Sequence, residues 1–265
     1  MADNGPAQAV GEAVDWLGRP VSCKDCPHES MRTQGRCDLG RICVRDRRSK
    51  RIDRFFASNP LLANRYLQHP YFELRVLAAK HASVFLLPRL IGDDEPDVRA
   101  MVAYRLPVSR IAVLKNDPDR KVRLAVAQRV EGQDLIDMLA DEDYAVRIIA
   151  AFRAPADVLA IARADTEPEV RRIVARRIVV EQLPPMMFDP DPLVRIEVAQ
   201  RLAPGQLGVL VHDSDLRVRF IVAERCGPEL LPYLIHDRDP EVQAAAERRT
   251  AELEAGKEDA DGPRA

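Results

Sequence analysis

The stretch DPDPLVRIEVAQR, at residues 189–201, recurs in variant forms every 24 residues along most of the chain. A Val-Arg pair lies at its centre, an Asp stands five residues before the Val, and an Arg stands seven residues after it. The pairs are Val98-Arg99, Val122-Arg123, Val146-Arg147, Val170-Arg171, Val194-Arg195 and Val218-Arg219, with Leu74-Arg75 before them and Val242-Gln243 after. A fixed period with this many matched positions is typical of a solenoid, in which each unit buries its apolar face against its neighbours.

The half of each unit that contains the Val-Arg pair has the periodicity of an α-helix. Apolar residues stand at the Val and four, five and eight residues later, as in Val194, Val198, Ala199 and Leu202. This spacing predicts a helix of about three turns that begins two residues before the Val. Proline, which ends a helix because it lacks a backbone N–H, follows in four units, at Pro107, Pro155, Pro204 and Pro228. Acidic residues such as Asp189 and Asp191 precede the helix, where we expect carboxylates to cap its first turn.

The other half of the unit has apolar residues three positions apart. They are Leu87 and Leu90, Ile111 and Leu114, Leu135 and Met138, Leu183 and Met186, Leu207 and Leu210, and Leu231 and Leu234. A spacing of three aligns side chains on a short 3₁₀-helix. The two prolines between Leu183 and Met186 argue against a strand there. We therefore expect α-helices alternating with short 3₁₀ segments, without a sheet.

Composition narrows the class of protein. Of 265 residues, 46% are hydrophobic but only 5% are aromatic, which favours thin layers of aliphatic side chains and Ala over one large globular centre. The formal net charge is −2, so overall charge points neither to nucleic acid nor to a membrane. No apolar run approaches the length of about 20 residues that a membrane span needs, and the start of the chain lacks the pattern of a secretory signal. We expect a cytoplasmic protein.

Four of the five cysteines fall close together, at Cys23, Cys26, Cys37 and Cys43. In a cytoplasmic protein such a cluster indicates a metal site more than disulfides. Structural zinc commonly takes two C-x2-C pairs or a pair plus histidines. Here the second pair is spaced C-x5-C, which suits a [4Fe-4S] cube better because each cysteine binds a separate iron. His28 is interpreted as an exposed loop residue and Cys226 as a small buried core residue.

Basic residues surround these cysteines. Between residues 23 and 54 there are ten Lys and Arg and five Asp and Glu, an excess of five positive charges. The excess is interpreted as neutralising a cluster that carries about two negative charges, or as a solvated face. A nucleic-acid interface at residues 41–54 is the alternative. We expect Phe55 and Phe56 to close the first layer of the solenoid, and Trp16 to pack under the cysteine segment.

The repeat with its L-x2-L, Asp, Val-Arg and Ala-x-Arg positions, preceded by the four-cysteine segment, resembles one known family. These are the leucine-rich repeat variant proteins, described from the nitrogen-fixation gene region of diazotrophic bacteria. The resemblance implies an all-α fold, a right-handed superhelical solenoid of alternating α- and 3₁₀-helices. It also implies a small N-terminal domain in which Cys23, Cys26, Cys37 and Cys43 bind a [4Fe-4S] cluster. The first unit departs from the pattern with His69 and His81, and the last with Gln243 and Glu247, as expected for terminal repeats.

The expected organisation is a cluster-binding domain at residues 1–58 with a tail at 1–20, eight repeats at 59–250, and a disordered tail at 251–265. Stacking places the Asp and the two Arg of each unit in columns, which we expect to pair between neighbouring units and cap the turns. We predict no enzyme. The predicted function is that of an iron-sulfur repeat protein that docks a protein partner and serves electron transfer or redox sensing, with a link to nitrogen fixation. The alternatives are a nucleic-acid-binding regulator and a zinc-binding interaction protein.

Overall fold

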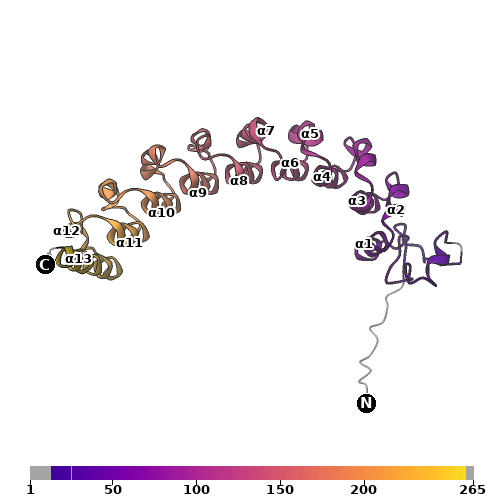
Figure 1. Cartoon of the computed structure of the whole chain (residues 1–265), viewed down its shortest axis with the longest axis horizontal. Coiled ribbons are helices and arrows are strands. Elements are labelled where there is room, and N and C mark those ends of the chain that lie inside the picture. Colours follow the sequence, from indigo (N-terminus) through magenta and orange to yellow (C-terminus); the bar gives the residue numbers. More distant parts are fainter. Residues whose placement is uncertain (1–12, 25, 261–265) are drawn as a thin grey trace, which may run out of the picture. The chain divides into compact units, whose positions relative to one another are not determined.

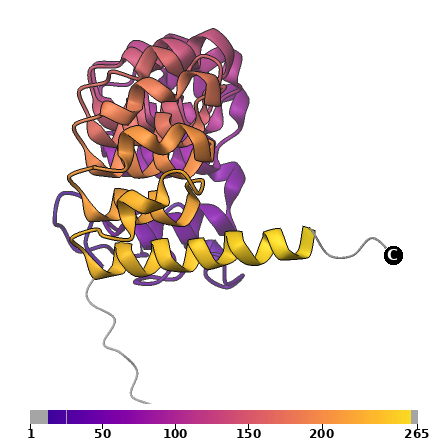
Figure 2. The same ribbon diagram turned by 90° about the vertical axis from the view of Figure 1, so that its left-hand side faces the viewer.

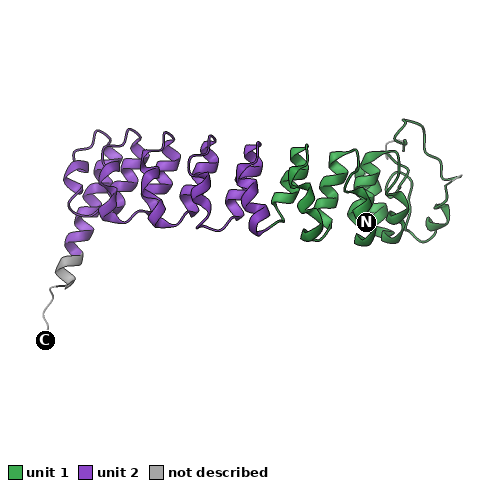
Figure 3. Ribbon diagram, turned by 90° about the horizontal axis from the view of Figure 1, so that it is seen from above, with its two compact units in different colours: residues 1–130 green, residues 131–265 purple. Residues whose placement is uncertain are grey.

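The computed structural model describes residues 13–24 and 26–260, and the described chain is helical. It contains no β-strand in these ranges, only two isolated bridges, Val14 with Pro20 and Asp38 with Ile42. None of the described helices is long and apolar enough to cross a membrane. The chain divides into two compact units, residues 1–130 and 131–265 (Figure 3). The predicted all-α fold of repeated helices is confirmed.

Unit 1 begins with an irregular segment that holds one 3₁₀-helix, η1 (Glu29–Met31), and then becomes regular. The elements that follow are α1 (Ser49–Ser58), α2 (Pro60–Ala63), η2 (Asn64–Tyr66), α3 (Phe72–His81), η3 (Val84–Leu90), α4 (Pro96–Arg105), α5 (Val108–Ile111), η4 (Ala112–Asn116) and α6 (Arg120–Ala127). Longer α-helices alternate with short helical turns from α3 onward (Figure 1).

Unit 2 continues the same alternation to the end of the described chain. Its elements are α7 (Gly132–Asp137), η5 (Met138–Ala140), α8 (Tyr144–Arg153), η6 (Leu159–Ala162), α9 (Pro168–Arg177), η7 (Val180–Gln182), η8 (Pro184–Phe188), α10 (Pro192–Arg201), η9 (Pro204–Leu210), α11 (Leu216–Arg225), α12 (Leu231–Leu234) and α13 (Pro240–Ala260). The second half of a repeat is 3₁₀ in some units, but in α5, α7 and α12 it is wholly or partly a turn of α-helix. The prediction of 3₁₀ segments is therefore only partly right, because segments of four to seven residues can close either hydrogen-bond register.

Helix α10 shows why the repeat folds as predicted. Pro192 stands at its first turn, where a missing N–H costs nothing, and the Asp191 carboxylate accepts a hydrogen bond from the Leu193 N–H at 2.7 Å. The helix ends at Arg201, and Leu202 turns to an extended conformation before Pro204. Both ends of the helix lie where the sequence predicts them.

The core consists of small and branched aliphatic side chains in successive layers. In α8, Val146, Ala150 and Ala151 are fully buried, and Leu159 on the following turn is fully buried as well. Cys226 is also fully buried, which confirms it as a core residue. At the start of the first repeat, Phe55 and Phe56 are fully buried, which confirms that they close that layer. Alanine is small, so the helices of neighbouring repeats can pack closely in thin layers without a large aromatic centre.

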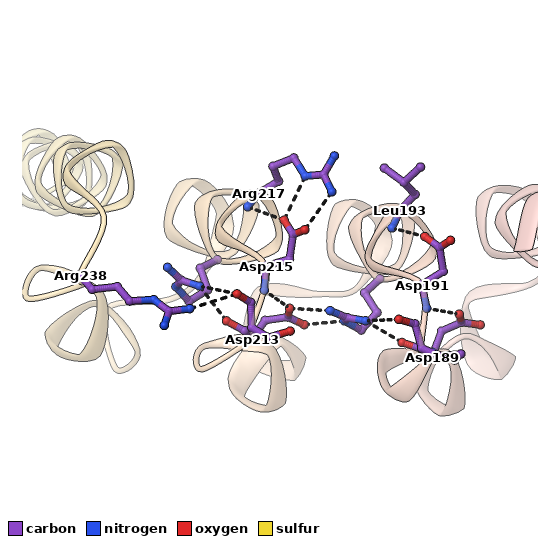
Figure 4. Close-up of polar contacts among 11 residues, drawn as sticks. Asp189, Asp191, Leu193, Asp213, Asp215, Arg217 and Arg238 are labelled. Carbon is purple, nitrogen blue, oxygen red and sulfur yellow. Dashed lines mark hydrogen bonds and ion pairs between the residues drawn. The ribbon is translucent and has the colours of Figure 1, made fainter.

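In six repeats the first Arg forms a clamp with the Asp of the following repeat. Arg147 donates two parallel hydrogen bonds to the Asp165 carboxylate, at 2.7 and 2.8 Å, and a third to the Asp141 carbonyl at 2.9 Å. Asp165 also accepts from the Glu167 N–H at 2.8 Å, which caps the turn. Within the units the same pair recurs as Arg75–Asp93, Arg99–Asp117, Arg171–Asp189, Arg195–Asp213 and Arg219–Asp237. Figure 4 shows this arrangement around Asp189 and Asp213.

The second Arg column has a different role from the predicted pairing with Asp. Arg177 donates to the carbonyls of Ala151 and Ala154, at 2.6 and 2.9 Å, where α8 ends. These carbonyls have no partner within the helix, and the helix dipole makes that end negative. Arg105, Arg129, Arg201 and Arg225 cap the preceding repeat helix in the same way. Both columns are thus engaged in holding successive repeats together.

We expect Arg177→Ala to lower the free energy of unfolding by about 1–3 kcal/mol, because it removes a charged donor from two carbonyls of α8. Urea denaturation followed by circular dichroism measures the loss. Arg163→Ala is the matched control, since Arg163 lies in the same unit and its side chain makes no hydrogen bond or ion pair with the described part of the chain. Equal effects of the two substitutions would show that the carbonyl contacts contribute nothing.

Two boundaries differ from the expected organisation. Helix α13 runs to Ala260 as one long helix (Figure 2), so the prediction of a disordered tail is wrong for residues 251–260. The sequence after the last repeat is rich in Ala and Glu, which are strong helix formers. Residues 261–265 and most of the predicted tail at 1–20 lie outside the described residues. The division between compact units falls at residue 130, inside the repeats, and the boundary expected at residue 58 stays a prediction.

Candidate metal centre

The cysteine segment is built from tight turns. The Cys26 N–H donates to the Cys23 carbonyl at 3.1 Å, so the C-x2-C pair sits in one turn, as its spacing predicts. Further along, the Asp38 and Ile42 bridge encloses Gly40, whose φ of 81° is a left-handed conformation that favours glycine. This turn brings Cys37 and Cys43 back toward each other across the bridge.

The four cysteines lie in one part of the fold. Burial, followed by the nearby Cys43, Cys26 and Cys23 thiols, raises the pKa of Cys37 to about 11. All four cysteines are free of disulfides; Cys37 and Cys43 are buried, whereas Cys23 and Cys26 are partly exposed. Among the described residues, no three His, Cys, Asp or Glu side chains form a group that could hold a metal ion as they stand. One pair of the predicted ligands is thus buried and the other lies near the surface, and their assignment to one metal centre stays a prediction.

Backbone amides support the sulfur of Cys43. Burial raises the pKa of the Cys43 thiol, and hydrogen bonds from the backbone N–H groups of Arg45 and Asp46 oppose that rise. The Cys43 N–H itself donates to the Arg51 carbonyl at 3.2 Å at the start of α1. Amide N–H groups directed at a ligating sulfur stabilise its negative charge and tune an attached metal centre. The donor set, four thiols with amides on one of them, fits an iron-sulfur cluster.

Aromatic side chains pack between the cysteine segment and the first repeat. His28 is buried and shares a 2.6 Å hydrogen bond with the Tyr66 hydroxyl, and its ring packs 5.1 Å from that of Phe55. Burial and the charge of Arg65 lower the pKa of His28. Burial, with a contribution from Cys26, raises the pKa of Tyr66 to about 12, so the phenol stays protonated. The interpretation of His28 as an exposed loop residue is therefore wrong, because Phe55 and Tyr66 enclose it.

The carboxylates of the segment act internally. Asp46 is buried, pairs with Arg51 and accepts from the Arg48 N–H at 2.9 Å. Asp15 accepts from the backbone N–H groups of Leu17 and Arg19, both at 2.9 Å. Exposed cations consequently dominate the surface of this segment. They are Lys24, Arg32, Arg36, Arg41, Arg45, Arg47, Arg48, Lys50 and Arg54.

Trp16 does not lie under the cysteines. Its ring stacks on that of Tyr71 at 6.1 Å, with an angle of 11° between the planes, and 40% of the residue is exposed. The chain reverses between the bridged residues Val14 and Pro20, and this turn carries Trp16 outward to the first repeat. The prediction for Trp16 is therefore wrong.

Sequence reasoning missed the supporting residues from outside the cysteine segment. Tyr66 lies in the first repeat, and Asn59 donates its side-chain N–H to the Arg36 carbonyl at 2.8 Å and the Phe55 carbonyl at 2.9 Å. Both residues connect the cysteine segment to the solenoid. Neither belongs to a spaced motif, so only their placement in space reveals the role.

Comparison with known proteins agrees with this geometry. Residues 13–65 match the sequence family described as "LRV protein FeS4 cluster". An uncharacterised 27.7 kDa protein of the nifB 3′ region of Rhodobacter capsulatus is 50% identical over 98 residues, which are 37% of this chain and 40% of that relative. This match therefore spans less than half of the relative's length.

A solved structure of a leucine-rich repeat variant, with a repetitive motif described as novel, is similar over 86% of this chain and 98% of its own, with 40% identity and a TM-score of 0.83. The likeness thus extends well beyond the residues that match the iron-sulfur family. With this extent of identity and an iron-sulfur segment ahead of the repeats, the chain belongs to the leucine-rich repeat variant proteins.

Proposed function

We propose that Cys23, Cys26, Cys37 and Cys43 bind a [4Fe-4S] cluster, and that the chain uses it for electron transfer or redox sensing with a protein partner. The match of residues 13–65, which contain all four cysteines, to an iron-sulfur family carries this proposal. When bound, such a cluster exchanges single electrons, at a potential set by its hydrogen bonds and exposure. The relative from a nitrogen-fixation gene region supports a role linked to that process.

Different residues of the chain would bind the cluster, stabilise its charge and exclude water from it. Cys37 and Cys43 form the buried side of the site, and the Arg45 and Asp46 amides stabilise the charge on the Cys43 sulfur. His28, Tyr66 and Phe55 exclude water on the side of the first repeat. Cys23 and Cys26 are the partly exposed pair, so an electron would enter or leave most directly on their side.

We propose a structural and docking role for the repeats, without catalysis. The Asp and Arg columns, which are their most regular charged feature, are engaged in contacts between successive units. Solenoids commonly bind partners along the surfaces that such stacking exposes.

Metal analysis tests the proposed cluster against the zinc alternative. Protein purified without oxygen is expected to contain about four irons and four acid-labile sulfides per chain, because four thiolates complete a [4Fe-4S] cube. Iron, zinc and sulfide are measured on the same sample. Stoichiometric zinc without sulfide would establish the structural zinc site instead.

A further inference from the structure

Charge is distributed unequally between the two units. Residues 1–130 contain 23 Lys and Arg against 15 Asp and Glu, a formal net charge of +8. Residues 131–265 contain 17 against 27, a formal net charge of −10. The near-neutral total of −2 therefore conceals a basic unit that carries the cysteines. A charged region of this size attracts partners of opposite sign and raises their association rate.

The basic charge of the cysteine segment is on its surface. Nine cations are exposed between residues 24 and 54, and Glu29 is the one exposed acid among the described residues of that range. Asp46 is buried and pairs with Arg51, whereas the side chains of Asp38 and Asp53 are partly exposed. The excess of five positive charges in residues 23–54 exceeds the roughly two negative charges of an oxidised [4Fe-4S] core with four thiolates. The loaded segment thus remains basic.

Three of the exposed cations lie in the same part of the segment as the cysteines. Lys24 follows Cys23 directly, and the Arg45 guanidinium donates to the carbonyl of Ser22 at 3.3 Å. The charge of Arg32 acts on the Cys37 sulfur. Cys23 and Cys26 are the partly exposed cysteines, so cations border the side of the site that a partner can approach.

We propose that Lys24, Arg32 and Arg45, together with the partly exposed Cys23 and Cys26, form a docking surface for a small acidic protein that carries a one-electron redox centre. This surface presupposes the cluster proposed above, because the cluster explains why the exposed thiols and the cations coincide. Opposite charge steers such a carrier to the cysteines and fixes its orientation there.

Nucleic acid fits the same surface less well. Single strands bind where cations alternate with exposed aromatic rings on which bases stack. Phe55 and Phe56, the aromatic residues that follow the cations in sequence, are fully buried, and one face of Trp16 is already covered by Tyr71.

Binding of a small acidic [2Fe-2S] ferredoxin to the anaerobically purified full chain tests the surface. We expect salt-dependent binding, which Lys24→Glu/Arg32→Glu weakens about tenfold or more at about 0.1 M salt, where charges interact over about 10 Å. The matched control is Arg110→Glu/Arg120→Glu, which reverses two exposed cations in later repeats of unit 1, on α5 and α6, and is expected to change the affinity by less than about twofold.

The other possible results of the binding experiment lead to different conclusions. Equal weakening by both variants, or no binding to a chain that holds its cluster, would overturn the docking surface. Tighter binding of duplex DNA than of ferredoxin would assign the surface to nucleic acid. Iron and sulfide are measured in each preparation, so a chain without iron-sulfur cluster would refute the proposed function separately from the result for docking. Circular dichroism confirms that each variant is folded.

Discussion

Arg147→Ala is expected to lower the free energy of unfolding by about 3–5 kcal/mol, the range found when one partner of a buried ion pair is removed. Only 12% of the Arg147 side chain and 6% of the Asp165 side chain are exposed. The substitution leaves the Asp165 carboxylate without its two hydrogen bonds from Arg147, and the Asp141 carbonyl without its donor. Urea denaturation of the full chain, followed by circular dichroism, measures the loss.

The loss of stability in Arg147→Ala can be compared with that caused by truncating a core residue. Val146→Ala removes two methyl groups from a fully buried position beside Arg147, at a typical cost of about 1–3 kcal/mol. We therefore expect the Arg substitution to cost more than the Val substitution. A loss below about 1 kcal/mol for Arg147→Ala would show that solvent screens the pair despite its burial.

The pH dependence of stability tests the Arg147–Asp165 pair independently. Burial opposes ionisation of Asp165, but hydrogen bonds from Arg147 and the Glu167 N–H outweigh it and hold the pKa below its ordinary value. A depressed pKa contributes stability that is present above the unfolded-state pKa of about 3.9 and is lost as pH falls through the folded-state pKa. The difference between wild type and Arg147→Ala is therefore expected to shrink below about pH 4.

The repeated elements were predictable because the same local signals occur in each unit. Asp191, Pro192 and the apolar face of Val194 and Val198 all specify the same helix, and the structure places α10 there. The burial of the Arg–Asp pair was not predictable in the same way. A column in the sequence shows which residues recur, but only the stacked layers show that Arg147 and Asp165 are shielded from water.

The turn that holds the first cysteine pair was predictable from the sequence, but the surroundings of the cysteines were not. The C-x2-C turn is a local feature, so its spacing predicts it directly. The contacts of Tyr66 with His28 and of Asn59 with Arg36 join residues 38 and 23 positions apart. Such contacts depend on how α1 and η2 pack against the irregular segment, which no single motif encodes.

Cys43→Ser is expected to abolish cluster binding, whereas Cys226→Ser keeps it. Cys43 is buried, and its sulfur accepts hydrogen bonds from the Arg45 and Asp46 amides, so a substitute oxygen must occupy a site shaped for a larger, softer atom. Cys226 caps α11 in unit 2, and burial raises the pKa of its thiol, which keeps it a neutral core residue. Iron, sulfide and visible absorption are measured on both variants.

The two variants together separate ligation from folding. Each replaces a buried sulfur by oxygen, so a general effect of the substitution on stability would appear in both. The helical circular dichroism signal should persist in Cys43→Ser, because Cys43 precedes α1 and lies outside the repeats. Full iron and sulfide content in Cys43→Ser would remove Cys43 from the ligand set, and loss of iron in Cys226→Ser would show that the cluster depends on unit 2. Iron lost from Cys43→Ser alone, with the helices intact, is the result that the proposed set of four cysteine ligands predicts.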